Sequence, residues 1–188
     1  MAGDVRRRMV DGAVLLLAKR GLHGTSFADV LALTGAPRGS IYHHFPDGKD
    51  QLVGSAVELA GARALALLDD KAGDSAFEVA EFFLAMWRSV LTRGRYEIGC
   101  AVLAVTVATD SPELLDLTAA VFRGWRQRLA ELLAQGGLPG PVAAQFSATL
   151  IASSEGAVVL SRAERSTEPF DLVAGQLLDQ IRRASDEA

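Results

Sequence analysis

The segment that most constrains this chain is residues 27–52, which have the sequence FADVLALTGAPRGSIYHHFPDGKDQL. The pattern predicts two short helices separated by a turn, followed by the start of a third, longer helix. Ser26 and Asp29 have the spacing of a capping box at the start of the first helix. Gly35 suits the turn because a residue without a Cβ atom enters turn conformations easily. The segment therefore has the layout of a helix-turn-helix.

The second helix of this segment is predicted from Pro37 to His44. Pro37 fits its first position, where a missing N–H group is not needed. A helix so short and polar is not stable alone, so its neighbours must hold it in place. In helix-turn-helix proteins the second helix enters the major groove of DNA. The residues of this helix that we expect at the DNA are Pro37, Arg38, Gly39, Ser40, Tyr42, His43 and His44.

Several motifs in the N-terminal quarter resemble the DNA-binding domain of the tetracycline-repressor (TetR) family. They are Thr25-Ser26-Phe27, Gly35, the run GSIYHHFP at 39–46, Lys49 and Leu52. The extra residue in Asp47-Gly48, with the run APRG at 36–39, is similar to the LmrA/YxaF-type branch of drug-efflux regulators. In this family the residue that matches Thr25 commonly meets a DNA phosphate. The resemblance therefore implies that Thr25 and the neighbouring Ser26 lie at the DNA.

Tyr42 and Lys49 are the strongest candidates for contacts with the DNA backbone. Lys49 lies in the first turn of a predicted helix, where the helix dipole disfavours a cation and an external anion would explain it. A plain surface lysine is the alternative. Arg38 is the best candidate for recognising a base, because its fork matches O6 and N7 of guanine. Residues 6–8, all arginine, are either a solvated helix end or further phosphate contacts.

Charge is distributed unevenly along the chain. The formal net charge is −4, which argues against a DNA-binding protein, but residues 1–50 contain seven Lys or Arg and only five Asp or Glu. The basic end is thus the helix-turn-helix end. The single Cys100 excludes an intrachain disulfide and fits a reducing compartment. With no signal-peptide layout and no uncharged apolar run of about 18 residues, we expect a cytoplasmic protein without a membrane span.

The sequence does not favour an enzyme. Cys100 with a histidine would be the only nucleophile pair worth naming, but His23, His43 and His44 all lie in the first fifty residues. No G-x-S-x-G, P-loop, dinucleotide-binding or H-E-x-x-H motif occurs. A zinc site at His43 and His44 is not expected, because adjacent helix residues point in different directions and no further ligand cluster exists. We therefore expect neither a metal nor another cofactor.

The remainder of the chain predicts further helices and no strands. The segment CAVLAVTVA at 100–108 could be a buried strand by its pattern, but no second strand exists to pair with it, so we predict a helix. The resemblance implies an all-α fold of about nine helices. Counting the helices predicted from the apolar pattern of this sequence gives the same number. We expect a helix-turn-helix DNA-binding domain at 1–48 and a helical ligand-binding and dimerisation domain at 49–188. A helix at 49–70 would link the two.

Bulky apolar residues in the C-terminal two-thirds suggest a chamber for a small lipophilic ligand. Each of the apolar residues could instead be an ordinary core residue. Glu155 differs from them, because it is an acidic residue in an otherwise apolar predicted helix. The residues expected to line the chamber are Phe82, Phe83, Met86, Trp87, Leu103, Val107, Phe122, Trp125, Phe146, Leu150 and Glu155.

The last two predicted helices, at 141–164 and 169–184, suggest a dimer interface. The first of them is rich in small residues, which permit close approach of helices. We expect a homodimer that binds a palindromic operator and is released by a small lipophilic ligand, as in regulators of drug-efflux genes. The alternative is a helical protein-interaction or global regulatory module without a small-molecule inducer.

Overall fold

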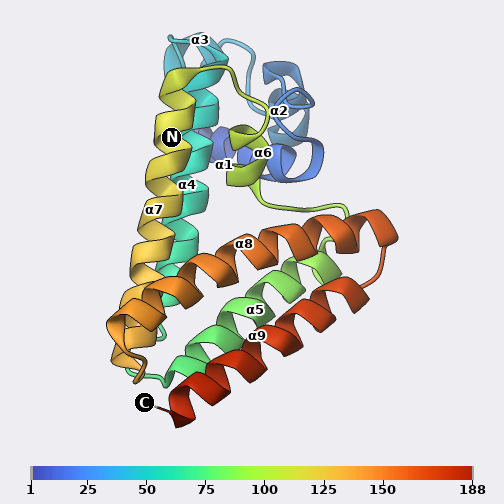
Figure 1. Ribbon diagram of the computed structural model, residues 1–188. Coiled ribbons are helices and arrows are strands. Elements are labelled where there is room, and N and C mark those ends of the chain that lie inside the picture. The colour runs from blue at the N-terminus through green and yellow to red at the C-terminus, as the bar shows by residue number, and fades with distance from the viewer. Residues whose placement is uncertain (1, 188) are drawn as a thin grey trace. The chain divides into compact units, whose positions relative to one another are not determined.

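The computed structural model describes residues 2–187, and over that range it contains nine helices and no strand (Figure 1). The all-α prediction is thus confirmed. A helix is present in the segment 100–108, but it is shorter than predicted, at Ala101–Thr106, and Val107 after it is exposed. The helices are α1 (Ala2–Arg20), α2 (Phe27–Thr34), α3 (Ser40–His44), α4 (Lys49–Asp69), α5 (Ala76–Arg93), α6 (Ala101–Thr106), α7 (Pro112–Gln135), α8 (Gly140–Glu164) and α9 (Glu168–Asp186).

The chain divides into two compact units. The head unit comprises residues 2–63 and 100–122, and the C-terminal unit comprises residues 64–99 and 123–187. Two of the three boundaries, 63/64 and 122/123, fall inside helices, so α4 and α7 each contribute residues to both units. The predicted boundary between residues 48 and 49 separates a DNA-binding domain from a ligand-binding and dimerisation domain. It divides the chain by function and not by packing, and it stays a prediction.

The head unit is built around α1, which packs against α2, α3 and α6. Met9 and Leu17 of α1 are fully buried, as is Val30 of α2. Gly12 allows the close approach of α1 and α2, since a Cβ atom there would lie 2.6 Å from Cγ2 of Thr34. This packing fixes α2 as the support of the following turn and of α3.

Local signals in the sequence define the ends of α2. The side chain of Ser26 accepts a hydrogen bond from the Asp29 N–H over 3.2 Å, and the Ser26 N–H donates to the Asp29 carboxylate over 3.1 Å. The capping box predicted here is therefore confirmed. Gly35 ends the helix with φ of 65°, in the left-handed region that favours glycine.

The second helix of the motif is shorter than the sequence predicts. α3 begins only at Ser40, after a turn in which the Ser40 N–H donates to the Pro37 carbonyl over 2.9 Å. The Ile41 N–H donates in the same way to the Arg38 carbonyl over 3.3 Å. Bonds of this i to i+3 spacing belong to a tight turn and not to an α-helix. The prediction that Pro37 opens an α-helix is therefore wrong.

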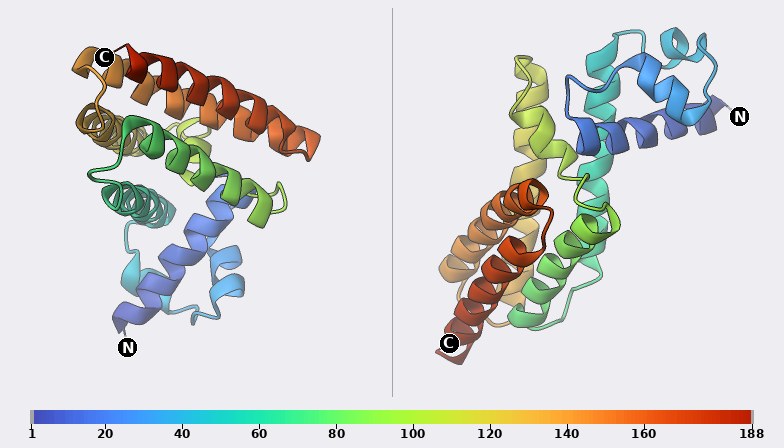
Figure 2. Two further views of the ribbon diagram at one scale, coloured as in Figure 1. Left: turned by 90° about the horizontal axis from the view of Figure 1, so that it is seen from below. Right: turned by 90° about the vertical axis from the view of Figure 1, so that its right-hand side faces the viewer.

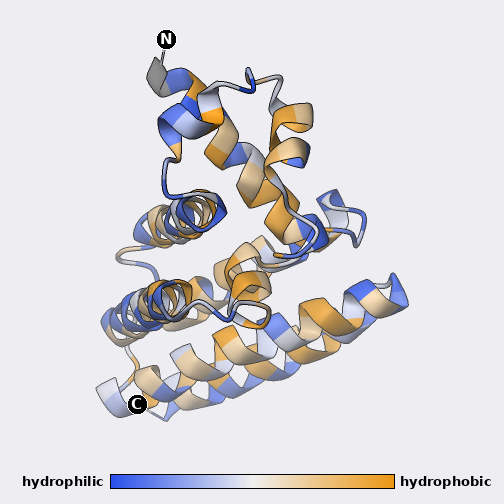
Figure 3. Ribbon diagram, turned by 90° about the horizontal axis from the view of Figure 1, so that it is seen from above, coloured by the Kyte–Doolittle hydropathy of each residue, from blue (hydrophilic) through white to orange (hydrophobic). Residues whose placement is uncertain are grey.

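In the C-terminal unit, α5, α8 and α9 run side by side (Figures 1 and 2). Apolar and polar residues alternate along the helices that lead to the C-terminus (Figure 3). Phe170 and Ile181 of α9 are buried, as are Phe83 of α5 and Leu150 of α8. An ion pair between Arg88 and Asp171, 2.7 Å from Nε to Oδ1, adds a polar link between α5 and α9.

Two helices, α4 and α8, are long and apolar enough to cross a membrane by length and composition alone, with mean hydropathies of 1.3 and 1.2. Both contain an acidic residue well inside the helix, Glu58 in α4 and Glu155 in α8. Glu155 is only 7% exposed, and α8 packs with α5 and α9. Packing with α5 and α9 therefore accounts for part of the apolar character of α8, since 39% of its apolar window is buried.

Candidate functional site

The polar face of α3 and its preceding turn is exposed. Tyr42 is 82% exposed, and Arg38 and His43 are also exposed. Ile41 and Phe45, in contrast, are buried and anchor the short helix in the head unit. The helix and the turn before it therefore present the phenol of Tyr42, the guanidinium of Arg38 and the imidazole of His43 to solvent.

The other polar residues predicted at this surface are placed around it. Pro37, Gly39 and Ser26 are exposed, and Ser40 and His44 are half-buried. The rings of His43 and His44 lie 4.8 Å apart between centroids in an edge-on arrangement. Each of these residues except Gly39 and Pro37 offers a side-chain group that can form hydrogen bonds with a nucleic acid.

Thr25 differs from its neighbours because it is only 1% exposed. Its hydroxyl donates to the Gly21 carbonyl over 2.8 Å, and its N–H donates to the Leu22 carbonyl over 3.3 Å. Both donors are therefore used inside the protein. This geometry gives Thr25 a structural role in the turn between α1 and α2, and its contact with a DNA phosphate stays a prediction.

Lys49 has an internal partner that the sequence did not reveal. Its Nζ atom donates to the Leu22 carbonyl over 2.8 Å, so the first residue of α4 is tied to the turn after α1. An external anion is therefore not needed to explain a cation at this helix start. The ammonium group has three donors, and Lys49 is half-buried, so the remaining donors can still bind a phosphate.

Two of the N-terminal arginines also form contacts inside the head unit. Arg6 donates from Nη2 to the Ser55 hydroxyl over 3.0 Å, and its guanidinium lies 5.4 Å from the centre of the Phe45 ring. Arg8 donates to the carbonyl of Thr34, the last residue of α2, over 3.3 Å. These arginines therefore help to position the helix-turn-helix. Sequence patterns could not show this, because the partners lie 26 to 49 positions away in the chain.

The residues expected to form a ligand chamber do not all belong to one unit. Leu103, Val107 and Phe122 lie in the head unit, and Val107 is 74% exposed. The other eight lie in the C-terminal unit, where Phe83, Trp87, Trp125, Leu150 and Glu155 are buried and Phe82, Met86 and Phe146 are half-buried. Each buried apolar residue among them fits the alternative role of a core residue, and Glu155 is the one buried charged residue of the set.

Phe82 and Met86 line an apolar groove of about 630 Å³ in the C-terminal unit. The groove follows α5 and is closed by Leu67 at the end of α4 and by Ile98 in loop 94–99. Its other lining residues are Ala85, Ser89, Val90, Arg93 and Gly94. The sequence reasoning missed Leu67 and Ile98, because no local pattern shows that they meet α5. It also missed Arg93, although Arg93 lies seven residues after Met86 on the same helix.

The head unit thus has the features of a helix-turn-helix DNA-binding protein: a short anchored helix, an exposed polar face and a Gly35 turn. Comparison with known families agrees. Residues 9–56 match the family described as bacterial regulatory proteins, tetR family, and residues 76–176 match the family described as transcriptional regulator LmrA/YxaF-like, C-terminal domain. The chain belongs to the TetR family of transcriptional regulators, in its LmrA/YxaF-like branch.

Full-length relatives support the same assignment. An HTH-type transcriptional regulator of Mycobacterium tuberculosis is 35% identical over 179 residues, covering 92% of this chain and 91% of the relative. The HTH-type transcriptional regulator YxaF of Bacillus subtilis is 28% identical over 96% of this chain and 97% of its own. A TetR transcriptional regulator from Chloroflexus aurantiacus has a similar crystal structure, with a TM-score of 0.79, 28% identity and 96% coverage of both chains.

Proposed function

We propose that this TetR-family regulator is a ligand-responsive repressor that binds a palindromic operator as a homodimer. The observation that carries the proposal is the 82% exposure of Tyr42 on a short helix whose apolar residues, Ile41 and Phe45, are buried. An exposed tyrosine next to exposed Arg38 and His43 has no partner in the core and is suited to DNA. A relative named as the transcriptional repressor DhaR, from a Mycobacterium species, is 24% identical over 201 residues and supports the repressor role.

Within this proposal the residues of the surface have different roles. Arg38 recognises a base, because a guanidinium can donate two hydrogen bonds to guanine. Tyr42, Ser26 and the remaining donors of Lys49 bind phosphates, which positions the head without selecting a sequence. Ser40, His43 and His44 contribute further contacts to bases or phosphates. Pro37 and Gly39 shape the turn that brings Arg38 to the major groove of the DNA.

The dimer is proposed to form through α8 and α9. Leu160 on α8 is 51% exposed, and Leu172 on α9 is 69% exposed. Gly156 is also exposed, and a Cβ atom there would have no contact within 4 Å outside its own turn of helix. Exposed apolar residues beside a glycine allow two copies to pack closely. Dimerisation would present two recognition helices about 34 Å apart, the spacing of successive major grooves.

The apolar groove along α5 is the proposed ligand site. Phe82 and Met86 line it together with Leu67, Val90 and Ile98, and its volume of about 630 Å³ lies in the range of small-molecule sites. The lining favours a lipophilic ligand. Since LmrA/YxaF-like regulators resemble this chain throughout residues 76–176, we infer that the controlled gene is a drug-efflux gene. The ligand must bind the DNA-free state of the dimer more tightly than the DNA-binding state. A ligand with equal affinity for both states does not shift the equilibrium between them.

The two parts of the proposal have separate tests. Selection of bound sites from random DNA should yield a palindrome, and a sequence without two related half-sites would contradict dimeric recognition.

For the ligand, a screen of lipophilic compounds for release of that DNA should be run on the wild type and on Met86→Arg, which places a charge in the groove. Release of the wild type but not of the variant supports the site. Equal release of both would contradict it. Gln127→Arg, at an exposed position of α7 that lies outside the groove lining and outside α8 and α9, is the matched control for the added charge.

A further inference from the structure

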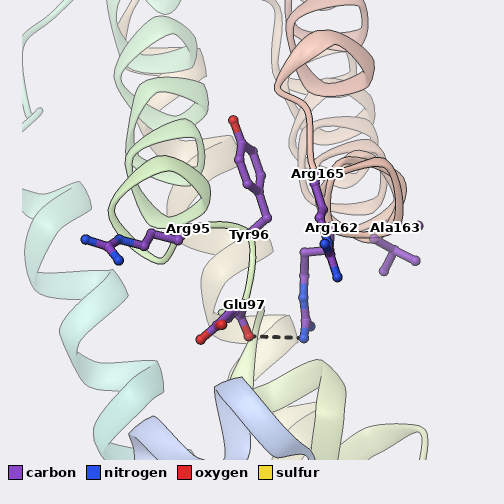
Figure 4. Close-up of a pocket in the computed structure, with 7 residues that line it drawn as sticks. Arg95, Tyr96, Glu97, Arg162, Ala163 and Arg165 are labelled. Carbon is purple, nitrogen blue, oxygen red and sulfur yellow. Dashed lines mark hydrogen bonds between the residues drawn. The ribbon is translucent and has the colours of Figure 1, made fainter.

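A polar cavity of about 580 Å³ lies between loop 94–99 and the C-terminal end of α8 (Figure 4). It is lined by Arg95, Tyr96 and Glu97 of the loop and by Val159, Arg162 and Arg165 at the helix end. The apolar groove uses Gly94 and Ile98 of the same loop but none of the residues of the polar cavity. The two concavities are therefore separate sites that share one loop.

The backbone around the polar cavity is unusual. Over residues 2–187, three residues other than glycine have positive φ, and all three line this cavity: Arg95 at 48°, Tyr96 at 61° and Arg165 at 52°. This left-handed region is disfavoured for residues with a Cβ atom. Arg165 follows α8 directly, at a position where glycine is the usual residue. Disfavoured conformations of this kind concentrate at ligand sites.

The arginines of the cavity are not neutralised by acidic side chains. In the described part of the chain, Arg95, Arg162 and Arg165 form no salt bridge, whereas Arg88 pairs with Asp171 over 2.7 Å. Arg162 instead donates from Nη2 to the backbone carbonyl of Glu97 over 3.1 Å, the dashed contact in Figure 4. The same view shows the side chain of Arg95 extending away from Arg162. Arg162 and Arg165 therefore provide the positive charge at the helix end.

We propose that this cavity binds a small aromatic oxyanion, with its carboxylate or phosphate held by Arg162 and Arg165. A guanidinium presents donors in a planar fork that matches both kinds of oxyanion. The half-buried ring of Tyr96 and the side chain of Val159 supply a surface for a planar apolar body. The single carboxylate in the lining, that of Glu97, lies beside the carbonyl bonded by Arg162 and leaves an excess of positive charge. The proposal does not depend on the ligand of the apolar groove.

The direct test is an NMR titration of the full-length protein with phenyl phosphate and, separately, with benzoate. These probes share an aromatic ring and differ in the oxyanion, so the two titrations show which anion the site prefers. The wild type should bind at least one of them with a Kd of about 1 mM or tighter. Arg165→Gly should weaken that binding by about tenfold or more, as expected for the loss of a charged hydrogen bond. Arg183→Gln, which removes an exposed arginine of α9, is the control for net charge and should bind as the wild type does.

A stability measurement separates a binding role of Arg165 from a structural one. Glycine is at ease at φ of 52°, so Arg165→Gly should raise Tm by about 2 to 4 °C while it weakens binding. Wild-type protein that binds neither probe at about ten times the expected Kd would overturn the proposal. Unchanged binding in Arg165→Gly would overturn it as well. Loss of the dimer in that variant, with no probe bound by the wild type, would instead assign the arginine to the contact between copies.

Discussion

The Nζ atom of Lys49 donates a hydrogen bond to the carbonyl oxygen of Leu22 over 2.8 Å, which ties the start of α4 to the turn that follows α1. α3 lies between these two points in the chain, so the contact closes the segment that carries the recognition helix. If Lys49 also binds a phosphate with its remaining donors, replacing it has two separable effects.

Lys49→Met should lower the stability of the protein by about 1 kcal/mol through loss of this hydrogen bond. It should also weaken binding to all DNA sequences and reduce the slope of log K against log salt by about one, the value expected for one phosphate contact. Thermal unfolding and fluorescence anisotropy at several salt concentrations measure the two effects. An unchanged slope with weaker binding would limit Lys49 to its structural role.

Arg38 and Tyr42 should respond differently to substitution. Arg38→Ala should cost about 1 to 3 kcal/mol on the operator and much less on random DNA, because a base contact is lost. Tyr42→Phe removes only the hydroxyl and should weaken binding equally on both. Competition assays with operator and random DNA of equal length test this, and equal losses for Arg38→Ala would reject its role in recognising a base.

Gly12 should be intolerant of larger residues because α1 and α2 approach closely there. A Cβ atom would lie 2.6 Å from Cγ2 of Thr34, so Gly12→Val should destabilise the head unit by about 1 to 3 kcal/mol. Gly124→Ala in α7 is the control, since its Cβ atom would meet only Leu65 Cδ1, at 4.0 Å. Chemical denaturation of both variants checks the prediction, and equal midpoints would contradict it.

The dimer proposed through α8 and α9 predicts a strong effect at Gly156. In one copy a Cβ atom at this exposed position has no contact within 4 Å outside its own turn of helix, so Gly156→Arg should leave the fold intact. In a closely packed dimer the same side chain would clash and bury a charge, which is costly without a partner. Analytical ultracentrifugation should therefore show a monomer with native helix content. A dimer of unchanged stability would place the interface elsewhere.

The stability of the C-terminal unit should depend on pH through Asp171. A hydrogen bond from Arg88 lowers the pKa of the Asp171 carboxyl, and burial partly opposes this effect. A carboxyl whose pKa is lower in the folded state stabilises the fold above its unfolded pKa of about 3.9, and this contribution is lost as the pH falls through the folded pKa.

Asp171→Asn has no such group to titrate. The difference in the free energy of unfolding between wild type and variant should therefore be largest near neutral pH and shrink as the pH falls below about 4. Urea unfolding across this range measures it. A difference that does not change with pH would show that the ion pair of Arg88 and Asp171 contributes nothing to the acid response.

Much of the fold was predictable because its signals are local. The capping box of Ser26 and Asp29 and the turn at Gly35 follow from short-range patterns, and the structure confirms both. The helix α6 was predicted for a different reason, because no second strand exists to pair with that segment, and a helix is present there. The start of α3 was predicted wrongly, since Pro37 opens a tight turn just as readily as an α-helix.

The details of the sites were less predictable because they depend on contacts between distant residues. Lys49 and Leu22 are 27 positions apart, and Arg6 and Ser55 are 49 apart. The apolar residues of α5 could be recognised as bulky, but only the fold separates Phe82 and Met86, which line the groove, from buried Phe83 and Trp87. Thr25 shows the same limit, because its burial cannot be seen in a motif.

The most direct test of sequence-specific DNA binding is fluorescence anisotropy of the purified protein with the DNA upstream of its own gene. Random DNA of equal length serves as the control, and the titration is repeated at several salt concentrations and with Tyr42→Phe. We predict tighter binding to the upstream DNA, weakening with salt and weaker still for the variant. Equal affinity for upstream and random DNA, with no enriched palindrome after selection from a random pool, would contradict the proposed operator-binding repressor.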